Sequence, residues 1–314
     1  MDNALPDVRA GIKTFFVVPD LSIFPEECLK SFCLHGYEAY FIHDDPYCPL
    51  ISKIHLLISA FSETILFFNI DRKVPGIEWS SFIRKVQRTY GARVRIGVMF
   101  QKLNSAEETR KLERLYLYDI GITCGCIPLE YQRNKNLPLF LNVLAANKAN
   151  GQRKFLRAVC SDAFRISLGY KGRPYRSTIR DISLSHFSCV FPDEPPEIQL
   201  MEKIYDVQMN LRGTLCTVDA VLCLKRDIEQ QPIHVFVFRN SQDRDGLDYE
   251  QQERVNTVVF NYFSNGVNEF LHKLFDAERL RVSLARGQAS SSGGEEQTLE
   301  SLNIDVNKLL ESVT

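Results

Sequence analysis

Two stretches decide the fold expected for the second half of this chain: Arg153-Lys-Phe-Leu-Arg157 and Asp181-Ile-Ser183-Leu-Ser-His186. The first stretch carries two guanidinium groups at a spacing that lets them fork around phosphate oxygens and guanine acceptors. The second carries a carboxylate and a hydroxyl, which can bond the exocyclic donors and the edge of a purine. Neither stretch is specific alone, but together they indicate a nucleotide-binding protein and not an enzyme.

The segment that holds these stretches is basic, although the chain as a whole is close to neutral. Residues 153–180 contain eight Lys or Arg residues against the single acid Asp162, whereas the formal net charge of all 314 residues is −1. A local excess of positive charge suits an anionic ligand, and a solvated basic strand face is the alternative interpretation. The near-neutral total argues against a general nucleic-acid binder, which must neutralise many phosphates.

Beyond residue 150 the sequence alternates apolar and polar residues with period two, the pattern of strands with one buried face. Strands are predicted at 173–183 and 232–239, with two more between them. In each of these two strands the alternate apolar residues share one face. They are Tyr205, Val207, Met209 and Leu211 in the first strand, and Cys216, Val218, Ala220, Leu222 and Leu224 in the second. Apolar residues then recur at helical spacing from residue 255 to residue 274. The region is therefore predicted to be an antiparallel β-barrel with a C-terminal helix.

With these strands around them, the two stretches resemble the signature of the PilZ family, RxxxR followed after a few tens of residues by (D/N)xSxxG. That family binds the bacterial second messenger cyclic di-GMP. The resemblance implies that Arg153 and Arg157 grip this ligand, while Asp181 and Ser183 read its guanine. His186 stands where the family has glycine. A side chain there adds bulk and, at a left-handed position, strain of about 1–2 kcal/mol, although an imidazole could instead stack on a guanine face.

Simpler interpretations of the same residues stay open. Arg153 and Arg157 fit a pair of surface arginines whose charged heads remain in water. His186 fits a partly buried strand residue with a satisfied ring nitrogen. The predicted function is a cytoplasmic signalling protein that binds cyclic di-GMP and acts through a protein partner. The alternative is a ligand-independent adaptor whose domains have lost their chemistry and survive as binding surfaces.

The first half of the chain alternates short apolar runs with helix-like segments, the pattern of a parallel sheet with helices on both faces. The runs are rich in β-branched and aromatic residues, which favours strands over buried helices. Five strands are predicted at 13–19, 38–43, 64–71, 94–100 and 122–128, and five helices near 25–35, 49–61, 79–90, 105–118 and 137–148. The expected fold class is thus a doubly wound α/β domain with a five-stranded parallel sheet, followed by a β domain.

This order of strands and helices resembles a response-regulator receiver domain. Asp71-Arg-Lys-Val-Pro75 matches that family's D-x-x-M-P pattern, which implies that Asp71 is a candidate phosphoacceptor at the carboxyl end of the third strand. Asp20 matches one metal-binding acid and is a weak candidate ligand, but Pro19 replaces the second acid and Ile127 replaces the family's lysine. Without these groups, Mg²⁺ binding and stabilisation of phosphoryl charge should weaken. A pseudo-receiver that holds no metal is predicted, with Asp71 interpreted as a solvated acid.

Composition suggests three parts of the chain. The boundaries expected are 1–149 for the receiver-like domain, 150–276 for the barrel with its closing helix, and 277–314 for a linker and a terminal helix. Residues 286–296 are linker-like in composition. Apolar residues at 299, 302, 306, 309, 310 and 313 form a stripe, and such a short helix needs a surface on which to dock.

Other sequence features bear on the cellular compartment of the protein and on the catalytic and metal sites that it could contain. The chain shows no signal-peptide pattern and no apolar run long enough for a membrane span. Nine scattered cysteines suit reduced, packed thiols. Signatures of serine or cysteine nucleophiles and of P-loops are missing, so an enzyme is the weakest hypothesis, and no cofactor is expected. His43-Asp44-Asp45 invites a metal site, but a polar loop after the second strand explains it better.

Overall fold

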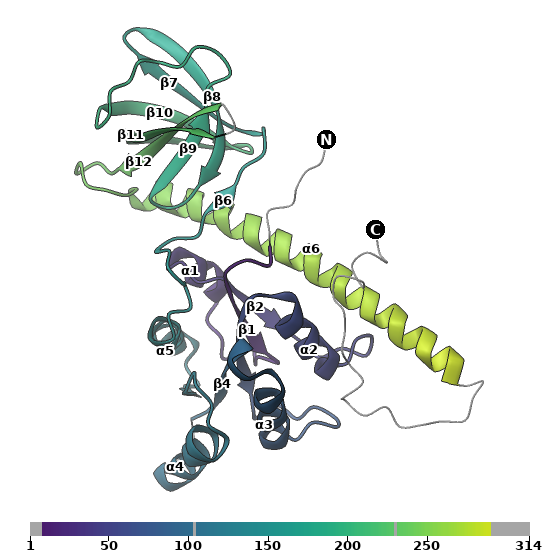
Figure 1. The fold of residues 1–314 in the computed structure, drawn as a ribbon. Helices are drawn as coiled ribbons and strands as arrows, with labels where there is room; N and C mark the ends of the chain where they lie inside the picture. Colours follow the sequence, from purple (N-terminus) through teal and green to yellow (C-terminus); the bar gives the residue numbers. More distant parts are fainter. Residues whose placement is uncertain (1–7, 103–104, 229–230, 290–314) are drawn as a thin grey trace. The chain divides into compact units, whose positions relative to one another are not determined.

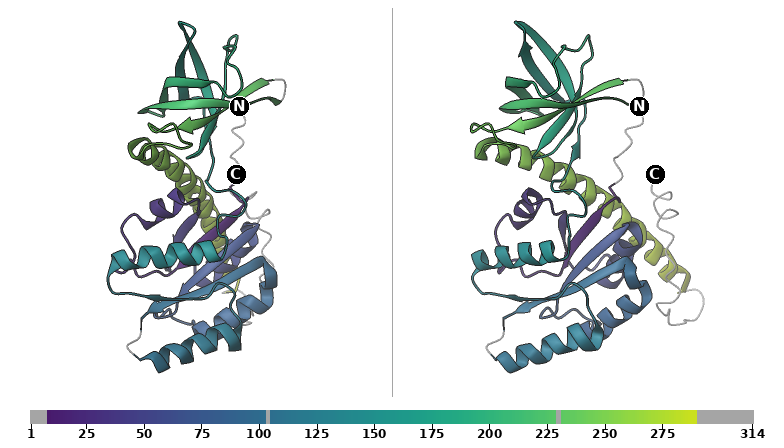
Figure 2. Two further views of the ribbon diagram at one scale, coloured as in Figure 1. Left: turned by 90° about the vertical axis from the view of Figure 1, so that its left-hand side faces the viewer. Right: turned by 60° about the vertical axis from the view of Figure 1, so that its left-hand side comes forward.

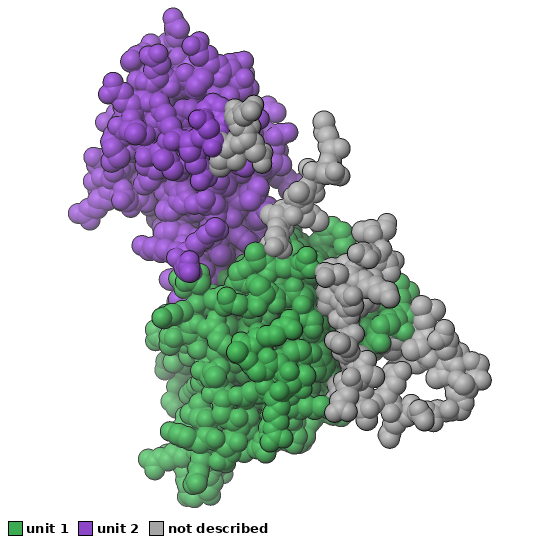
Figure 3. Space-filling view, viewed as in Figure 1, with its two compact units in different colours: residues 1–29, 38–151, 265–314 green, residues 30–37, 152–264 purple. Residues whose placement is uncertain are grey.

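The chain divides into two compact units (Figure 3). In the computed structural model, residues 8–102, 105–228 and 231–289 are described. Unit 1 comprises residues 1–29, 38–151 and 265–314, and unit 2 comprises residues 30–37 and 152–264. Helix α6 (Tyr249–Ala289) therefore supplies residues to both units. Composition suggests a boundary after the barrel's closing helix, whereas the division by contacts falls inside that helix.

Unit 1 contains a five-stranded parallel sheet with the strand order β2-β1-β3-β4-β5. This order confirms the predicted doubly wound fold, in which the crossover direction reverses between β1 and β3. Figure 1 labels β1, β2 and β4 of this sheet and the helices α1 to α5 around it. The strands are β1 (Ile12–Val17), β2 (Ala39–Ile42), β3 (Glu63–Asn69), β4 (Val94–Gln101) and β5 (Cys126–Leu129). The helices are α1 (Cys28–Leu34), α2 (Leu50–Ala60), α3 (Trp79–Tyr90), the turn η1 (Gly91–Arg93), α4 (Ala106–Arg114) with its π-helical extension η2 (Leu115–Ile120), and α5 (Arg133–Ala146).

Both faces of this sheet are buried, because successive residues of a strand point to opposite sides. Phe15 packs in the apolar cluster that includes residues of α2, α3 and the second half of α6. Phe16, the next residue, lies on the other face, where its ring contacts Phe24 and Phe140. Figure 2 shows the helices on either side of the sheet. Because both faces are buried, the strands are apolar at nearly every position, which explains the continuous apolar runs in the sequence.

The fifth strand is shorter than predicted. The sequence suggests a strand over 122–128, but β5 begins at Cys126. The backbone N–H groups of Thr123 and Cys124 both donate to the carbonyl of Ile96 in β4, so this segment bends against β4 and does not pair with it as a strand, and Gly125 has a φ of +85°. A left-handed residue cannot continue a strand, so pairing starts only after it.

Unit 2 contains a closed antiparallel barrel of six strands, which confirms the predicted β-barrel. Its sheet order is β6-β8-β7-β10-β11-β12-β9, and β9 also pairs with β8, so the six strands from β7 to β12 close the barrel. The short β6 pairs with the end of β8 and is not one of these six strands. Closure removes open sheet edges. The strands are β6 (Ala158–Val159), β7 (Phe164–Tyr170), β8 (Arg173–Ile182), β9 (His186–Val190), β10 (Lys203–Leu211), β11 (Thr214–Ile228) and β12 (Gln231–Arg239).

The barrel core confirms most of the period-two pattern but corrects it at two residues. Val207 and Met209 are buried as predicted, whereas Tyr205 is 63% exposed, because a β-bulge shifts the register between Ile204 and Val207. Leu224 is likewise 45% exposed, beyond a second bulge in β11. An extra residue in a strand reverses the faces on one side of it. The sequence pattern alone does not reveal these insertions.

The predicted long amphipathic helix is confirmed as α6. Val255 and Val259 pack into the barrel core, whereas Val267 and Leu274 pack into the core of unit 1. The helix runs to Ala289 and so includes the first residues of the predicted linker. The rest of that linker and the terminal apolar stripe lie outside the described residues. None of the nine cysteines forms a disulfide, and burial raises the pKa of the Cys189 thiol to about 12.

Candidate nucleotide-binding site

The pairing of β6 with β8 brings the two signature stretches together. Ala158 lies opposite Ile182 and Val159 lies opposite Asp181 in an antiparallel register. The N–H of Cys160 extends this pairing by donating to the carbonyl of Arg180 at 2.8 Å. Arg157 directly precedes β6, so it lies beside the end of β8, although all of β7 intervenes in the sequence.

The second stretch forms the hairpin between β8 and β9. The N–H of Ser183 donates to the carbonyl of His186 at 2.9 Å, which leaves Leu184 and Ser185 as a two-residue loop. The Ser183 side chain, predicted to contact a ligand, is buried, and its oxygen accepts from the N–H groups of Ser185 and His186 at 3.4 and 3.3 Å. Ser183 therefore orders the turn that carries His186.

Asp181, a residue of the barrel strand β8, forms an ion pair with Arg157. It is only 7% exposed, and its Oδ2 accepts a hydrogen bond of 2.6 Å from the hydroxyl of Ser188, its cross-strand neighbour. Its Oδ1 lies 3.5 Å from the Nε of Arg157, within ion-pair range but beyond good hydrogen-bond geometry. These two facing atoms are buried and have no hydrogen bond in the structure. The two groups are therefore held together by charge attraction and not by a hydrogen bond between these atoms.

His186 completes the arrangement as the first residue of β9. It is half-buried, its Nε2 is hydrogen-bonded to the guanidinium of Arg157, and its Nδ1 lies 2.8 Å from the hydroxyl of Ser185. Its φ is not positive, so the strain expected for a side chain at this position does not arise. Burial and then the guanidinium of Arg157 lower the pKa of His186, against the opposing effect of Asp181.

A cavity of about 470 Å³ opens beside these residues. Arg153 is exposed at its wall and close enough to His186 to help lower the pKa of the imidazole. The one acid that lines the cavity, Asp245, is mostly exposed and pairs with Arg239 at 2.8 Å. The lining is thus positive and carries an aromatic ring. It consists of Arg153, Lys154, Phe155, Arg157, Leu184, Ser185, His186, Asp245, Gly246, Leu247 and Gln252.

Sequence reasoning missed two parts of this site. Ser188 binds the carboxylate of Asp181, and the segment from Asp245 to Gln252 forms the far wall of the cavity. The first could have been found by folding 181–188 into a hairpin with a two-residue loop. The second depends on the closure of the barrel, for which residues 245–252 carry no sequence signal.

Asp71 and Asp20, which the sequence suggests as counterparts of receiver-domain residues, follow the carboxyl ends of two strands of unit 1. β3 ends at Asn69, and Asp71 follows in a turn, where its Oδ2 accepts from the N–H of Gln101 at 2.5 Å. Asp20 follows β1 and accepts from the hydroxyl and the N–H of Ser22, which lowers the pKa of Asp20. Ile127, at the position of the family's lysine, is 1% exposed in the core. Among the described residues, no group of three or more His, Cys, Asp or Glu side chains could hold a metal ion.

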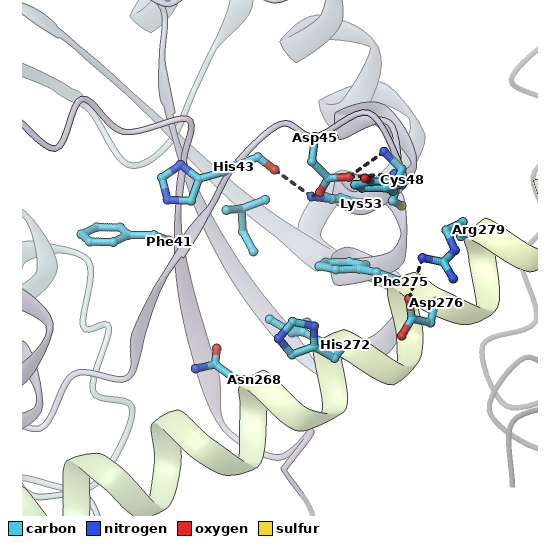
Figure 4. Close-up of a pocket in the computed structure, with 13 residues that line it drawn as sticks. Phe41, His43, Asp45, Cys48, Lys53, Asn268, His272, Phe275, Asp276 and Arg279 are labelled. Atoms are coloured by element: carbon cyan, nitrogen blue, oxygen red, sulfur yellow. Dashed lines mark hydrogen bonds and ion pairs between the residues drawn. The ribbon is translucent and has the colours of Figure 1, made fainter.

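A second cavity, of about 480 Å³, lies in unit 1 between the end of β2, α2 and α6 (Figure 4). Lys53 is buried there and donates to the carbonyl of His43 at 2.8 Å and to the carboxylate of Asp45. The other oxygen of Asp45 accepts from two N–H groups of its own loop. The charged groups of Lys53 and Asp45 are thus hydrogen-bonded to each other and to the backbone of the loop. His43-Asp44-Asp45 follows β2 as a polar loop.

Searches with the whole chain identify structural likeness only. No family model matches the sequence, and no curated protein matches it. Among solved structures, the PilZ domain of YcgR from Escherichia coli with c-di-GMP is similar at 14% identity and a TM-score of 0.32, over 38% of this chain and 96% of that one. K. pneumonia MrkH in complex with c-di-GMP (13%, TM-score 0.33) and the Bacillus subtilis inhibitor of motility MotI (13%, TM-score 0.30) are similar over 38% and 36% of this chain. The matches span about half of those two proteins, 55% and 52%.

Within the described residues, no helix combines the length and the apolarity needed to cross a bilayer.

Proposed function

We propose that this chain is a cytoplasmic signalling protein whose barrel binds cyclic di-GMP and passes the signal to a protein partner. One observation carries the proposal: Arg157 contacts both His186 and the buried Asp181, and Arg153, Arg157 and His186 line one positive cavity, although the two stretches come from distant parts of the sequence. Convergence of this kind is unexpected for a pair of unrelated surface arginines.

The chemistry of the cavity suits a dinucleotide. Arg153 and Arg157 supply forked donors for phosphate oxygens and for the O6 and N7 of guanine. On this proposal the Oδ1 of Asp181, which accepts no hydrogen bond in the ligand-free chain, accepts from the guanine N1–H and exocyclic amine once Arg157 turns to the ligand, and Phe155 offers a ring face. A ligand that bound both arginines would order the segment before β6 against the barrel, and this segment is one of the places where the chain passes between the two units. Such ordering is the proposed signal to the partner.

Isothermal calorimetry with purified full-length chain and cyclic di-GMP tests the proposal. We expect saturable binding that falls about 10- to 100-fold in Arg153→Ala, since a charge-assisted hydrogen bond contributes about 1.5–3 kcal/mol. Arg173→Ala removes an exposed arginine of β8 that does not line the cavity and should bind as the wild type does. Equal losses in the two variants, or binding of cyclic di-AMP with the same affinity, would contradict a specific site.

The second candidate function is a ligand-independent adaptor. It is favoured by the contacts that Arg157 already makes to Asp181 and His186 within the chain, and by the buried Ile127 in unit 1. On this hypothesis unit 1 is a pseudo-receiver whose Asp71 is a solvated acid and whose Asp20 holds no metal. The adaptor would show no heat with cyclic di-GMP at any pH, either as wild type or as His186→Gly.

A further inference from the structure

Arg157 and His186 line the cavity, and Arg157 contacts both His186 and the buried Asp181 behind it. The guanidinium of Arg157 lies between the carboxylate of Asp181 and the imidazole of His186. Ser188 fixes the carboxylate, and Ser185 fixes the far side of the imidazole. Arg157 is about one-third exposed, so it is held at the cavity wall and does not extend freely into the cavity.

The proton of the imidazole can be assigned from its partners. A guanidinium only donates hydrogen bonds, so the Nε2 of His186 must carry a lone pair. The proton of the neutral ring therefore lies on Nδ1, which donates to the hydroxyl of Ser185. Protonation of Nε2 would remove the acceptor and place a second positive charge against Arg157. The contact thus exists only with a neutral histidine.

We propose that His186 is a positioning residue that holds Arg157 against Asp181 in the ligand-free chain, and that protonation of His186 releases this arginine to bind an anionic nucleotide. We name the set of Arg157, Asp181 and His186 the arginine latch. The proposal rests on the proposed nucleotide-binding function, but the latch itself can be measured without a ligand.

The charges around the imidazole of His186 favour its neutral form in the ligand-free chain. Arg157 and Arg153 face it from the segment before β6, and Asp181 faces it from β8 as the opposing acid. Asp245, which lines the same cavity after β12, is paired with Arg239. A bound phosphodiester would reverse this balance, because its negative charge stabilises the imidazolium. Nucleotide and proton should therefore bind cooperatively, each strengthening the other.

Calorimetry with cyclic di-GMP between pH 8.0 and pH 5.5 tests the release. The phosphodiesters stay ionised over this range, so only the protein titrates. We expect wild-type affinity to rise as the pH falls, by up to about tenfold for each unit by which the ligand raises the pKa of His186. Circular dichroism at both pH values verifies that the chain remains folded. A wild-type affinity that is equal at both pH values would overturn the proposal.

Three variants separate the hydrogen bond from the bulk of the side chain. His186→Gln keeps an acceptor for Arg157 but cannot be protonated, so binding should remain weak and independent of pH. His186→Phe keeps the bulk without an acceptor, and His186→Gly removes both. Both should bind more tightly than the wild type at pH 8.0, and their affinity should not depend on pH, because neither holds Arg157 and neither can be protonated. If His186→Phe binds as weakly as the wild type at pH 8.0, bulk alone explains the effect and the latch is refuted.

Nuclear magnetic resonance of the histidine side chains tests the latch without any ligand. The chain has six histidines, and His186→Gln identifies the signal of interest. We expect the imidazole to titrate below the ordinary range of histidine and to move up in Arg157→Gln. An unshifted titration that Arg157→Gln does not change would overturn the latch, even if cyclic di-GMP binds. Conversely, a shifted titration with no binding in any variant would support the latch and refute the proposed ligand.

Discussion

The buried carboxylate of Asp181 allows a sharp prediction about what holds the site together. In Asp181→Ala, the Ser188 hydroxyl, in a residue only 1% exposed, loses its acceptor at 2.6 Å. Leaving a buried donor unsatisfied costs about 1–3 kcal/mol. The ion pair with Arg157 adds only about 0–1 kcal/mol, because the arginine is one-third exposed and can be rehydrated. We expect the barrel to lose about 1–4 kcal/mol in total, most of it from the unsatisfied Ser188 hydroxyl.

Asp181→Asn provides the matched comparison. The amide oxygen can still accept from Ser188, so only the ion pair is lost, and the cost should stay near about 1 kcal/mol or below. Asp245→Ala, an exposed acid of the same cavity, should change stability by less than about 0.5 kcal/mol.

Native-state hydrogen exchange measures these differences in the barrel alone. Peptides that cover residues 177–190, analysed by mass spectrometry over increasing urea, report the opening free energy of β8 and β9. The single tryptophan lies in unit 1 at residue 79 and does not report on the barrel. If Asp181→Asn destabilises these peptides as much as Asp181→Ala does, the hydrogen bond from Ser188 is not the main contribution. The reasoning above would then be wrong.

Three further predictions concern unit 1 and the dependence of stability on pH. Incubation with acetyl phosphate and Mg²⁺ should leave Asp71 unmodified by intact mass, because Ile127 supplies no positive charge, and a stable acyl phosphate would contradict the pseudo-receiver. Lys13→Met should destabilise unit 1 by about 3–5 kcal/mol in urea unfolding followed by Trp79 fluorescence, because it leaves the carboxylate of Glu38 buried and unpaired. Adding Glu38→Gln should recover much of that loss, whereas equal stability of the single and double variants would show that the pair does not couple. Finally, burial lowers the pKa of His55 and of His234, so their unfolded forms bind protons first as the pH falls. Stability should therefore be highest above the ordinary histidine pKa of about 6.5 and should decrease below it, and a flat urea midpoint from pH 7.5 to 5.5 would refute this.

The amino-acid sequence by itself determined most of the secondary structure. Apolar runs flanked by helical patterns specified the doubly wound sheet, because both faces of a parallel strand are buried and few polar residues are tolerated there. Period two specified the barrel strands, and helical spacing specified α6. These are local signals, since each depends on residues within one strand or a few helical turns.

Only the tertiary structure decided which side chains meet. Arg157 reaches Asp181 because β6 pairs with β8 and not with β7, its nearest neighbour along the chain. The bulge before Val207 turns Tyr205 outward, and α6 divides its apolar face between two cores. Register and closure arise from packing among strands far apart in the sequence, so no single segment encodes them. The sequence determined that two arginines and an acid are present, and the closed barrel decided that one of those arginines is held between the acid and a histidine.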